Sequence, residues 1–239
     1  MTMHMPAPGQ HAEDTNAGLS DHVAAELTRR VASGELPLGS WLRQNKIAEE
    51  FGISRTPVRE AIQSLSATGV VELIPNRGAR IRVPSPAEIE DGYRVRAELE
   101  GLAAELATKF ATQDQVDRLR AAEELFEVAV REVTDAGTSV EVGRQRWTQA
   151  NDDFHEIILE AARNRSLVSA IAWIHHTLPR NLTWNELSRD VRLMRSNVQQ
   201  HRAIREAIEA GDGQSARRAM IDHVMRSGDL VLVGLRNLS

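Results

Sequence analysis

The chain has 239 residues, which is enough for two domains, and its 41% hydrophobic and 26% charged content is ordinary for a globular protein. It has no cysteine, so disulfides and thiolate metal sites are excluded, and no apolar run approaches the roughly 18 residues that span a membrane. The net charge of −5 argues against nucleic-acid binding, but nine Lys/Arg stand against seven Asp/Glu between Ala17 and Val83, so the acidity lies elsewhere.

The N-terminal residues 1–18 lack the apolar segment of a signal peptide. We expect them to form a disordered tail, and we expect the protein to be cytoplasmic.

Three short helices are expected next. They cover 20–33 and 45–51, and the third begins at Ser54 and ends before Gly69. The second and third are separated only by a turn at Gly52, which is the spacing of a helix-turn-helix. Ser54 is a good N-cap because its hydroxyl can accept from a free N–H group of the first turn. Pro57 fits that turn because its missing N–H leaves no hydrogen bond unmade.

The third helix has two different faces. Val58, Ala61, Ile62 and Leu65 recur at helical spacing and predict a buried stripe. Arg55 and Arg59 recur four residues apart on another face, beginning in the first turn. Such a helix suits entry into the major groove of DNA with its N-terminus first. The alternative is a surface helix whose arginines are merely solvated.

A β-hairpin is expected after this helix. The segments 70–74 and 79–83 are rich in β-branched residues and flank a four-residue turn at 75–78. Helices followed by a hairpin make a winged helix-turn-helix. Its wing carries Arg77, which would reach a phosphate or the minor groove, although an arginine at a turn is often just solvated.

An all-α bundle of about six helices is expected to follow the boundary at 83–86. Ser85, Pro86 and Glu88 form a capping box at its start. The expected helices cover 86–110, 112–135, 140–162, 166–178, 187–210 and 213–236, and residues 179–186 are expected to be a link. The fold class is therefore mainly α, with a winged helix-turn-helix domain at 19–84 and a bundle at 85–239.

Three of the eight histidines fall on the apolar stripes of three separate bundle helices: His155, His201 and His223. Three imidazoles that point into one bundle can converge on a metal ion, and Asn151 or Asp152 would add an oxygen ligand. Nitrogen and oxygen donors without thiolate suit zinc, nickel or another first-row divalent ion. The alternative is that each histidine is a hydrogen-bonded core residue.

Both segments resemble a known family. The winged helix of GntR-family bacterial transcription regulators is similar to residues 38–42, 47–48, 54–61, Leu65, 69–71 and 77–78. The effector-binding domain of its FadR-like (FCD) branch resembles the bundle at Arg96, Glu100, 154–155, Asn164, His201, 207–208, 211–212 and His223. Together the two resemblances cover nearly everything after the N-terminal tail.

The resemblance implies a homodimer that binds a palindromic double-stranded DNA operator and responds to a small metabolite. The DNA contacts that carry over are Arg55, Thr56, Arg59, Arg77 and Gly78. Arg55 and Arg59 would read bases, whereas Ser54, Thr56 and Arg77 would hold phosphates. Asn45 is a departure, because relatives often have an arginine there.

In metal-containing members an aspartate and three histidines hold the ion, and a carboxylate of the effector can complete its coordination. The histidines correspond to His155, His201 and His223. The aspartate position corresponds to Asn151, whose neutral amide is a weaker ligand.

The expected effector is thus a small carboxylate. Arg96 lies on the inward-leaning stripe that contains Tyr93 and would offer it a second anchor, and the alternative for Arg96 is an internal ion pair with Glu100, one turn away. The segment 84–86 is short and stiff, so we expect it to relay the effector signal.

Three rival classes remain. One is a metal-dependent enzyme, but no nucleophile–base pair or His-Glu-x-x-His motif is present, so we expect no enzymatic activity. Another is a metal-free FadR-like regulator that senses an acyl thioester. The third is an architectural DNA-binding protein without an effector, for which so large a bundle has no purpose.

Overall fold

The computed structural model describes residues 10–134, 140–179 and 181–237. They form two compact units, which comprise residues 1–84 and 85–239. Within the described ranges, no helix combines the length and the apolar character needed to cross a membrane.

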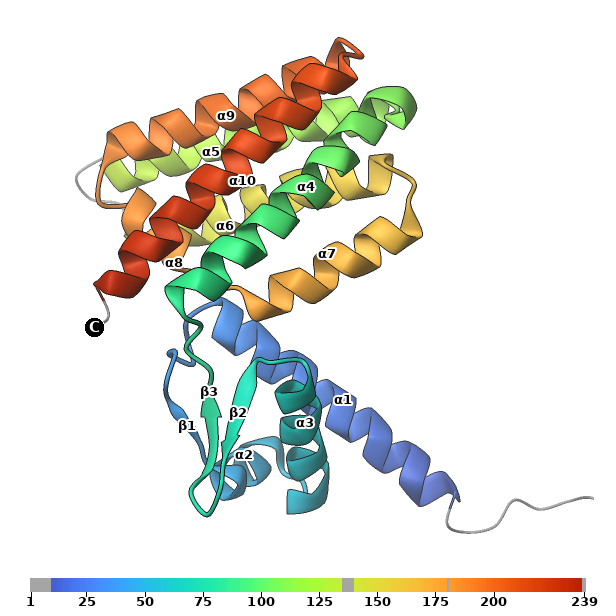
Figure 1. The fold of residues 1–239 in the computed structure, drawn as a ribbon, viewed down its shortest axis with the longest axis vertical. Coiled ribbons are helices and arrows are strands. Elements are labelled where there is room, and N and C mark those ends of the chain that lie inside the picture. The colour runs from blue at the N-terminus through green and yellow to red at the C-terminus, as the bar shows by residue number, and fades with distance from the viewer. Residues whose placement is uncertain (1–9, 135–139, 180, 238–239) are drawn as a thin grey trace, which may run out of the picture. The chain divides into compact units, whose positions relative to one another are not determined.

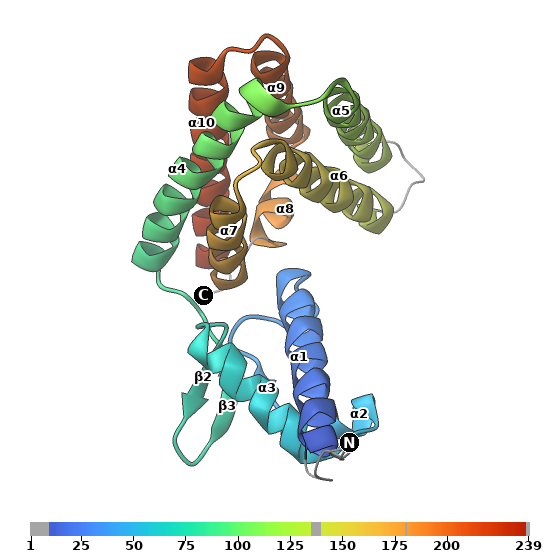
Figure 2. The same cartoon turned by 90° about the vertical axis from the view of Figure 1, so that its right-hand side faces the viewer.

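The first unit is a three-helix winged fold (Figure 1). In chain order its elements are α1 (Gln10–Ala32), β1 (Trp41–Leu42), α2 (Gln44–Phe51), α3 (Arg55–Ala67), β2 (Val71–Ile74) and β3 (Gly78–Ile81). The sheet is antiparallel, with the strand order β1-β3-β2. Helix α1 packs along α3 (Figure 2), and side chains from all three helices and the strands share one apolar core.

The turn between α2 and α3 depends on one glycine. Gly52 takes the left-handed conformation, with φ of 65°, and its N–H group bonds back to Ala48 O and Glu49 O. This αL cap ends α2 sharply and lets α3 begin three residues later. Ser54 occupies the expected N-cap position of α3, but its side chain makes no capping hydrogen bond, so only that part of the expectation is wrong.

Three details of the first unit differ from the expectations. Helix α1 begins at Gln10 rather than at residue 20. Residues 1–9 of the expected tail lie outside the described residues. Ile74 pairs with Gly78, so the wing turn has three residues rather than four. Strand β1 was not expected, because two residues carry no periodicity.

Within the described residues, the second unit has seven helices. They are α4 (Pro86–Phe110), α5 (Gln113–Thr134), α6 (Val140–Ala161), α7 (Arg165–Thr177), α8 (Asn181–Leu187), α9 (Val191–Glu209) and α10 (Gly213–Arg236). The capping box at the start of α4 is present: Ser85 Oγ accepts from Glu88 N, and Ser85 N donates to Glu88 Oε2. The expected link at 179–186 instead contains α8, because Leu182, Trp184 and Leu187 of this short helix are buried.

Two long antiparallel contacts organise the bundle: α4 packs along α10, and α5 along α6 (Figures 1 and 2). Gly228 of α10 allows the first contact to be close. A Cβ atom at this position would lie 2.8 Å from Tyr93 Cγ of α4, which is too close for any side chain. The absence of a side chain at Gly228 therefore allows the buried Tyr93 ring to lie against the α10 backbone.

Candidate metal centre and nucleic-acid interface

The exposed side of α3 carries arginines. Arg55 and Arg59 are both exposed, whereas Val58, Ala61 and Ile62 on the other side are fully buried in the unit's core. Pro57 in the first turn is also buried. The packing of one face thus leaves the basic face of α3 free for a partner.

The arginines of the first unit divide into two groups by their ion pairs. Arg29 and Arg30 pair with carboxylates of the same unit, and Arg80 pairs with Glu72. Four other exposed arginines each form no ion pair within the described part of the chain: Arg43, Arg55, Arg59 and Arg77. Uncompensated cations on α3, at the start of α2 and on the wing are what a polyanion would neutralise.

The other candidate DNA contacts are also accessible. Ser54, Thr56 and Asn45 are exposed near the starts of α3 and α2. Gly78 is exposed at the start of β3, with φ of 109°, a conformation that suits glycine. The structure leaves each of these residues able to meet a ligand, and their contacts with DNA remain predictions.

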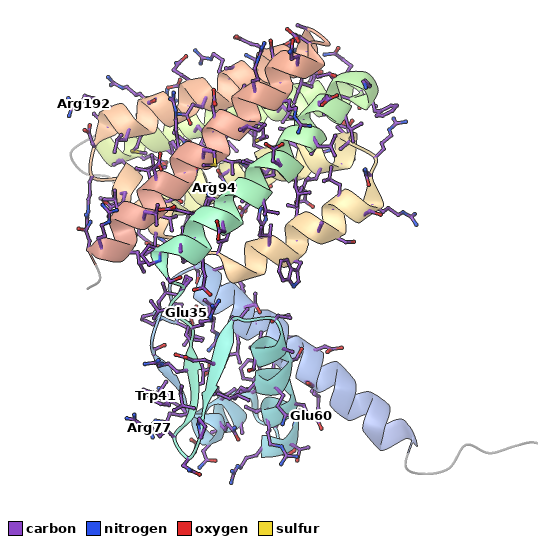
Figure 3. All side chains as sticks on the ribbon, in the orientation of Figure 1. Glu35, Trp41, Glu60, Arg77, Arg94 and Arg192 are labelled. Carbon is purple, nitrogen blue, oxygen red and sulfur yellow. The ribbon has the colours of Figure 1, made fainter. Side chains whose placement is uncertain are left out.

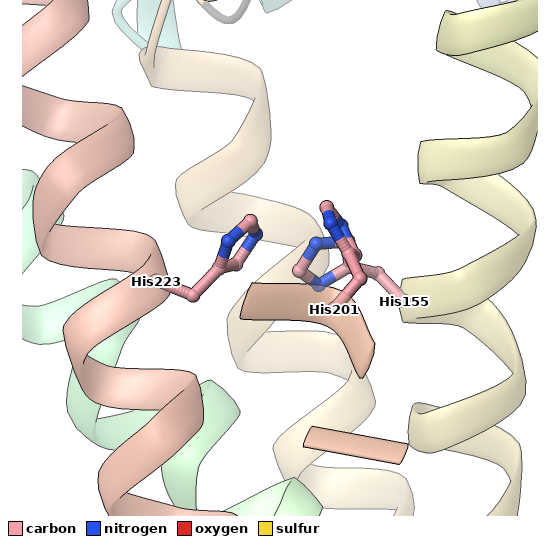
Figure 4. A group of neighbouring side chains, drawn as sticks. All are labelled: His155, His201 and His223. Atoms are coloured by element: carbon pink, nitrogen blue, oxygen red, sulfur yellow. The ribbon is translucent and has the colours of Figure 1, made fainter. Parts of the chain in front are cut away.

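Three histidines from α6, α9 and α10 meet inside the bundle (Figure 4). His155, His201 and His223 are each at most 4% exposed, and each offers a nitrogen within 4.8 Å of the others. Their ring centroids lie 4.3–5.8 Å apart. The structure therefore assembles the three side chains that the sequence placed on separate helices.

An oxygen atom lies close to Nδ1 of each imidazole. The pairs are His201 Nδ1 with Asn197 O at 2.9 Å, His223 Nδ1 with Gln200 Oε1 at 3.1 Å, and His155 Nδ1 with Glu100 Oε2 at 2.6 Å. A carbonyl oxygen can only accept, so His201 and His223 each carry their proton on Nδ1 and keep a lone pair on Nε2. The His155–Glu100 contact is close, but its angles do not meet those of a hydrogen bond.

The remaining ring nitrogens fit a metal ion. His155 Nε2 and His201 Nε2 are buried and have no hydrogen-bond partner among the described residues. Buried polar atoms without partners are costly, and a bound cation would satisfy them. Burial, followed by the neighbouring His155, lowers the pKa of His201 to about 3, and burial together with the other two histidines holds the pKa of His223 well below its usual range. Both rings are therefore neutral at physiological pH, which is the form that binds a metal.

The carboxylate beside this cluster is Glu100 of α4. Burial would raise its pKa, but Arg96, followed by contacts with His155 and His175, outweighs that effect and keeps the pKa well below the usual range. Glu100 Oε1 accepts from Arg96 Nε at 2.5 Å and lies 2.9 Å from His175 Nε2. An ionised carboxylate thus lies beside the histidine cluster.

The two candidate effector residues lie together in this region. Arg96 Cζ is 5.3 Å from the centroid of the Tyr93 ring, and both side chains are buried. The Arg96–Glu100 ion pair, the alternative considered from the sequence, is present. Of the expected oxygen ligands, Asn151 is half-buried on α6, one turn before His155, whereas Asp152 is exposed and outside the histidine group.

Sequence reasoning did not connect Glu100 with His155. The two residues belong to different helices and are 55 positions apart in the chain. The only local signal was the four-residue spacing of Arg96 and Glu100, which indicated an ion pair within α4.

The chain matches two family models. Residues 19–81 match the model described as bacterial regulatory proteins, gntR family, and residues 91–226 match the FCD domain. The FCD match alone covers more than half of the chain. Both segments lie where the sequence motifs placed them.

Several curated proteins are similar along most of their length. A probable D-xylose utilization operon transcriptional repressor of Paenarthrobacter nicotinovorans is 30% identical over 220 residues, which cover 88% of this chain and 87% of the relative. The HTH-type transcriptional repressor RspR of Escherichia coli (strain K12) is 24% identical over 209 residues, 86% of this chain and 85% of the relative. These relatives are described as transcriptional regulators rather than enzymes.

Solved structures share the fold. The structure titled E. coli McbR/YncC superimposes with a TM-score of 0.75 at 20% identity and covers 92% of this chain and 99% of its own. A putative transcriptional regulator GntR from Rhodococcus sp. RHA1 has a TM-score of 0.68 at 21% identity, with coverage of 90% and 97%. At this level of identity the likeness establishes the arrangement of helices and strands, and nothing about ligands.

Proposed function

Because this chain belongs to the GntR family of bacterial regulatory proteins and carries an FCD domain, we propose that its operator binding is controlled by a metal-containing effector site at His155, His201 and His223. The chain is a DNA-binding transcriptional regulator. The proposal concerns what the bundle binds and how binding at that site acts on the DNA-binding domain.

The unpartnered Nε2 atoms of His155 and His201 are the observation that carries the metal proposal. Two buried lone-pair nitrogens with a third imidazole beside them have the donor chemistry of a zinc site, and nickel or another first-row ion would also suit them. A bound ion would supply a positive charge that attracts an anionic ligand. Asn151 would be the fourth protein ligand, as the resemblance implies.

The position of Glu100 also fits a metal site. Asn151 is neutral where related metal sites have a carboxylate, so the candidate ligands bring no negative charge. Glu100 supplies one from just outside the histidines, at 2.6 Å from His155 Nδ1. A carboxylate at this place orients the ring and strengthens it as a ligand.

A small carboxylate is the effector class that best fits this environment. Arg96 would be its second anchor, next to Tyr93. Arg96 is already paired with Glu100. An effector carboxylate would therefore have to replace Glu100 as its partner, and that exchange would move a charge near His155 and His175.

The winged helix would read DNA as a symmetric pair. Two copies of α3, related by the two-fold axis of a homodimer, would enter the major groove at two half-sites of a palindrome. Arg55 and Arg59 would contact base edges, whereas Ser54, Thr56, Arg77 and Gly78 would lie along the backbone. Asn45 would add only a short-range contact.

A thermal-shift screen tests the effector site. The compounds are small carboxylates, including D-gluconate, together with the neutral sugar D-xylose, because relatives are named as repressors of gluconate and D-xylose operons. We expect a carboxylate to stabilise zinc-loaded protein and to have no effect on metal-stripped protein, by linkage of binding to folding. Equal stabilisation of both forms would contradict the metal anchor and favour the rival proposal, a metal-free pocket for an acyl thioester.

A further inference from the structure

A hollow of about 300 Å³ lies beside the wing and is lined by Trp41, Leu42, Arg43 and Arg77. Antiparallel pairing of β1 with β3 creates it, because the pairing sets Trp41 opposite Arg80 at the edge of the sheet. The hollow combines an aromatic wall with two exposed guanidinium groups.

Trp41 holds the wing arginine in place. Trp41 is 38% exposed, and Arg77 Cζ lies 5.5 Å from the centroid of its ring (Figure 3). Arg80 is also close, at 5.9 Å, but Glu72 neutralises it. A cation–π contact with the indole restricts the conformations of the arginine side chain but leaves its positive charge in place. Arg77 is therefore pre-positioned and available to an anion.

Arg43 brings the second charge. It occupies the N-cap position of α2, where its side chain makes no capping hydrogen bond, and the first turn of α2 contains no acidic residue. The free amides at this helix start favour an anion as well. Within the described ranges, neither Arg43 nor Arg77 forms an ion pair, so the hollow has no internal counter-charge.

We propose that Trp41, Arg43 and Arg77 form a backbone clamp for double-stranded DNA. The two guanidinium groups hold phosphates of the strand, and the exposed indole face packs against deoxyribose. The clamp rests on the operator reading by α3 proposed above and adds two residues, Trp41 and Arg43, that the family motifs did not single out as DNA contacts.

The clamp positions the protein and does not read sequence. Phosphate contacts are the same for every base pair, whereas Arg55 and Arg59 on α3 would contact the base edges that are exposed in the major groove. Removal of the clamp should therefore weaken binding to all duplexes by a similar factor.

Fluorescence anisotropy with full-length protein tests the clamp. The probe is a duplex recovered from a random pool with the wild-type protein, and a shuffled duplex serves for non-specific binding. We expect Arg43→Ala to weaken binding to both duplexes alike and to reduce the magnitude of the log Kd versus log salt slope by about 0.9 for each phosphate that the variant no longer neutralises. Trp41→Ala should weaken binding in the same uniform way, and Arg43→Lys should restore most of the slope.

Arg29→Ala is the matched control, because it removes one exposed arginine of the same unit that is paired with Glu26. It should leave the salt slope unchanged, and circular dichroism should show that all variants are folded. An unchanged slope in Arg43→Ala, or an altered base preference in place of uniform weakening, overturns the clamp. If Arg43→Ala loses only the stabilisation of the protein by free inorganic phosphate and still binds DNA as the wild type does, the hollow is an anion site and the clamp is wrong. If the wild type recovers no specific duplex at all, the proposed operator reading by α3 fails instead.

Discussion

At the scale of single residues, the histidine cluster depends on a neighbour that is not itself in the group of three. Glu100 stays ionised in a buried place because Arg96 lies against it, and its second oxygen faces His155. The Glu100 carboxylate therefore contacts both the Arg96 guanidinium and the His155 imidazole. Its removal should affect metal binding without removing a ligand.

We expect Glu100→Gln to weaken zinc binding about tenfold to hundredfold, because a carboxylate that orients a ligating histidine typically contributes that much. Competition with a chromophoric chelator measures the affinity. Glu98→Gln, on the exposed side of the same helix, is the control and should bind zinc as the wild type does. An unchanged zinc affinity in Glu100→Gln would show that the carboxylate only pairs with Arg96 and does not affect metal binding.

A second residue-scale prediction concerns base readout. Arg59→Ala should lose about 1–3 kcal/mol of discrimination between specific and shuffled duplexes, because a bidentate contact with a base contributes that much. Arg94→Ala removes an exposed arginine of α4 and should change nothing. Preserved specificity in a folded Arg59→Ala protein would exclude this residue as a reader.

At the scale of elements, close helix packing positions the site. Tyr93 lies directly against Gly228, so α4 and α10, which carry Glu100 and His223, cannot separate without breaking this contact. This close contact sets the spacing of the two helices. His223 is therefore held by the packing of its helix as well as by its hydrogen bond with Gln200.

Gly228→Ala should lower the free energy of unfolding by about 1–3 kcal/mol, the usual cost of overpacking a core. The added Cβ would meet the Tyr93 ring and its Cβ, neither of which is a flexible chain end. Urea unfolding gives the value. Gly18→Ala on α1, with no atom within 4 Å of the added Cβ, is the matched control and should be neutral or slightly stabilising.

The α5–α9 contact predicts a dependence on pH. Glu123 of α5 is partly buried, which would raise its pKa, but Arg205 and Arg202 of α9 lower it below the ordinary value of 4.5. Because the pKa is lower in the folded state, the stabilisation is fully present well above pH 4.5 and is lost as the pH falls through the folded-state value. Glu123→Gln should therefore be less stable than the wild type at neutral pH, and the difference should shrink in acid, as measured by urea unfolding under both conditions.

At the scale of the whole molecule, a regulator must couple two binding events. The effector changes DNA binding only if it favours one arrangement of the DNA-binding domains over another, and we expect the short segment 84–86 to transmit that preference. Its prolines limit the freedom of the connection. This coupling can be measured as the effect of the effector on DNA binding or as the effect of DNA on effector binding.

A carboxylate that weakens operator binding by some factor must itself bind less tightly, by the same factor, to the protein–operator complex. Calorimetric titration of the carboxylate found by the screen, with and without the recovered duplex, measures this. Typical couplings correspond to about a fivefold to 150-fold change. Equal affinity in both titrations would mean that the bundle ligand does not regulate DNA binding.

The sequence by itself determined most of the helices and the exposed basic face of α3. The bounds of α4 and α10 agree with the expectation at both ends, because caps at Ser85 and Asp212 and the apolar periodicity are local signals. The basic face of α3 follows from the same periodicity. The three histidines were recognisable because each lies on the buried stripe of its own helix.

Only the tertiary structure decided which groups meet. Strand β1 forms because Trp41 pairs with Arg80 on β3. Helix α8 forms because Trp184 and its apolar neighbours are buried in the bundle. The contact between Glu100 and His155 joins residues on two helices. Short segments have too little hydrophobic periodicity to be recognised from the sequence. The spacing of residues along one helix also does not determine which side chains of another helix they will contact. These contacts are set by long-range packing, and they create both the charge beside the histidines and the hollow beside the wing.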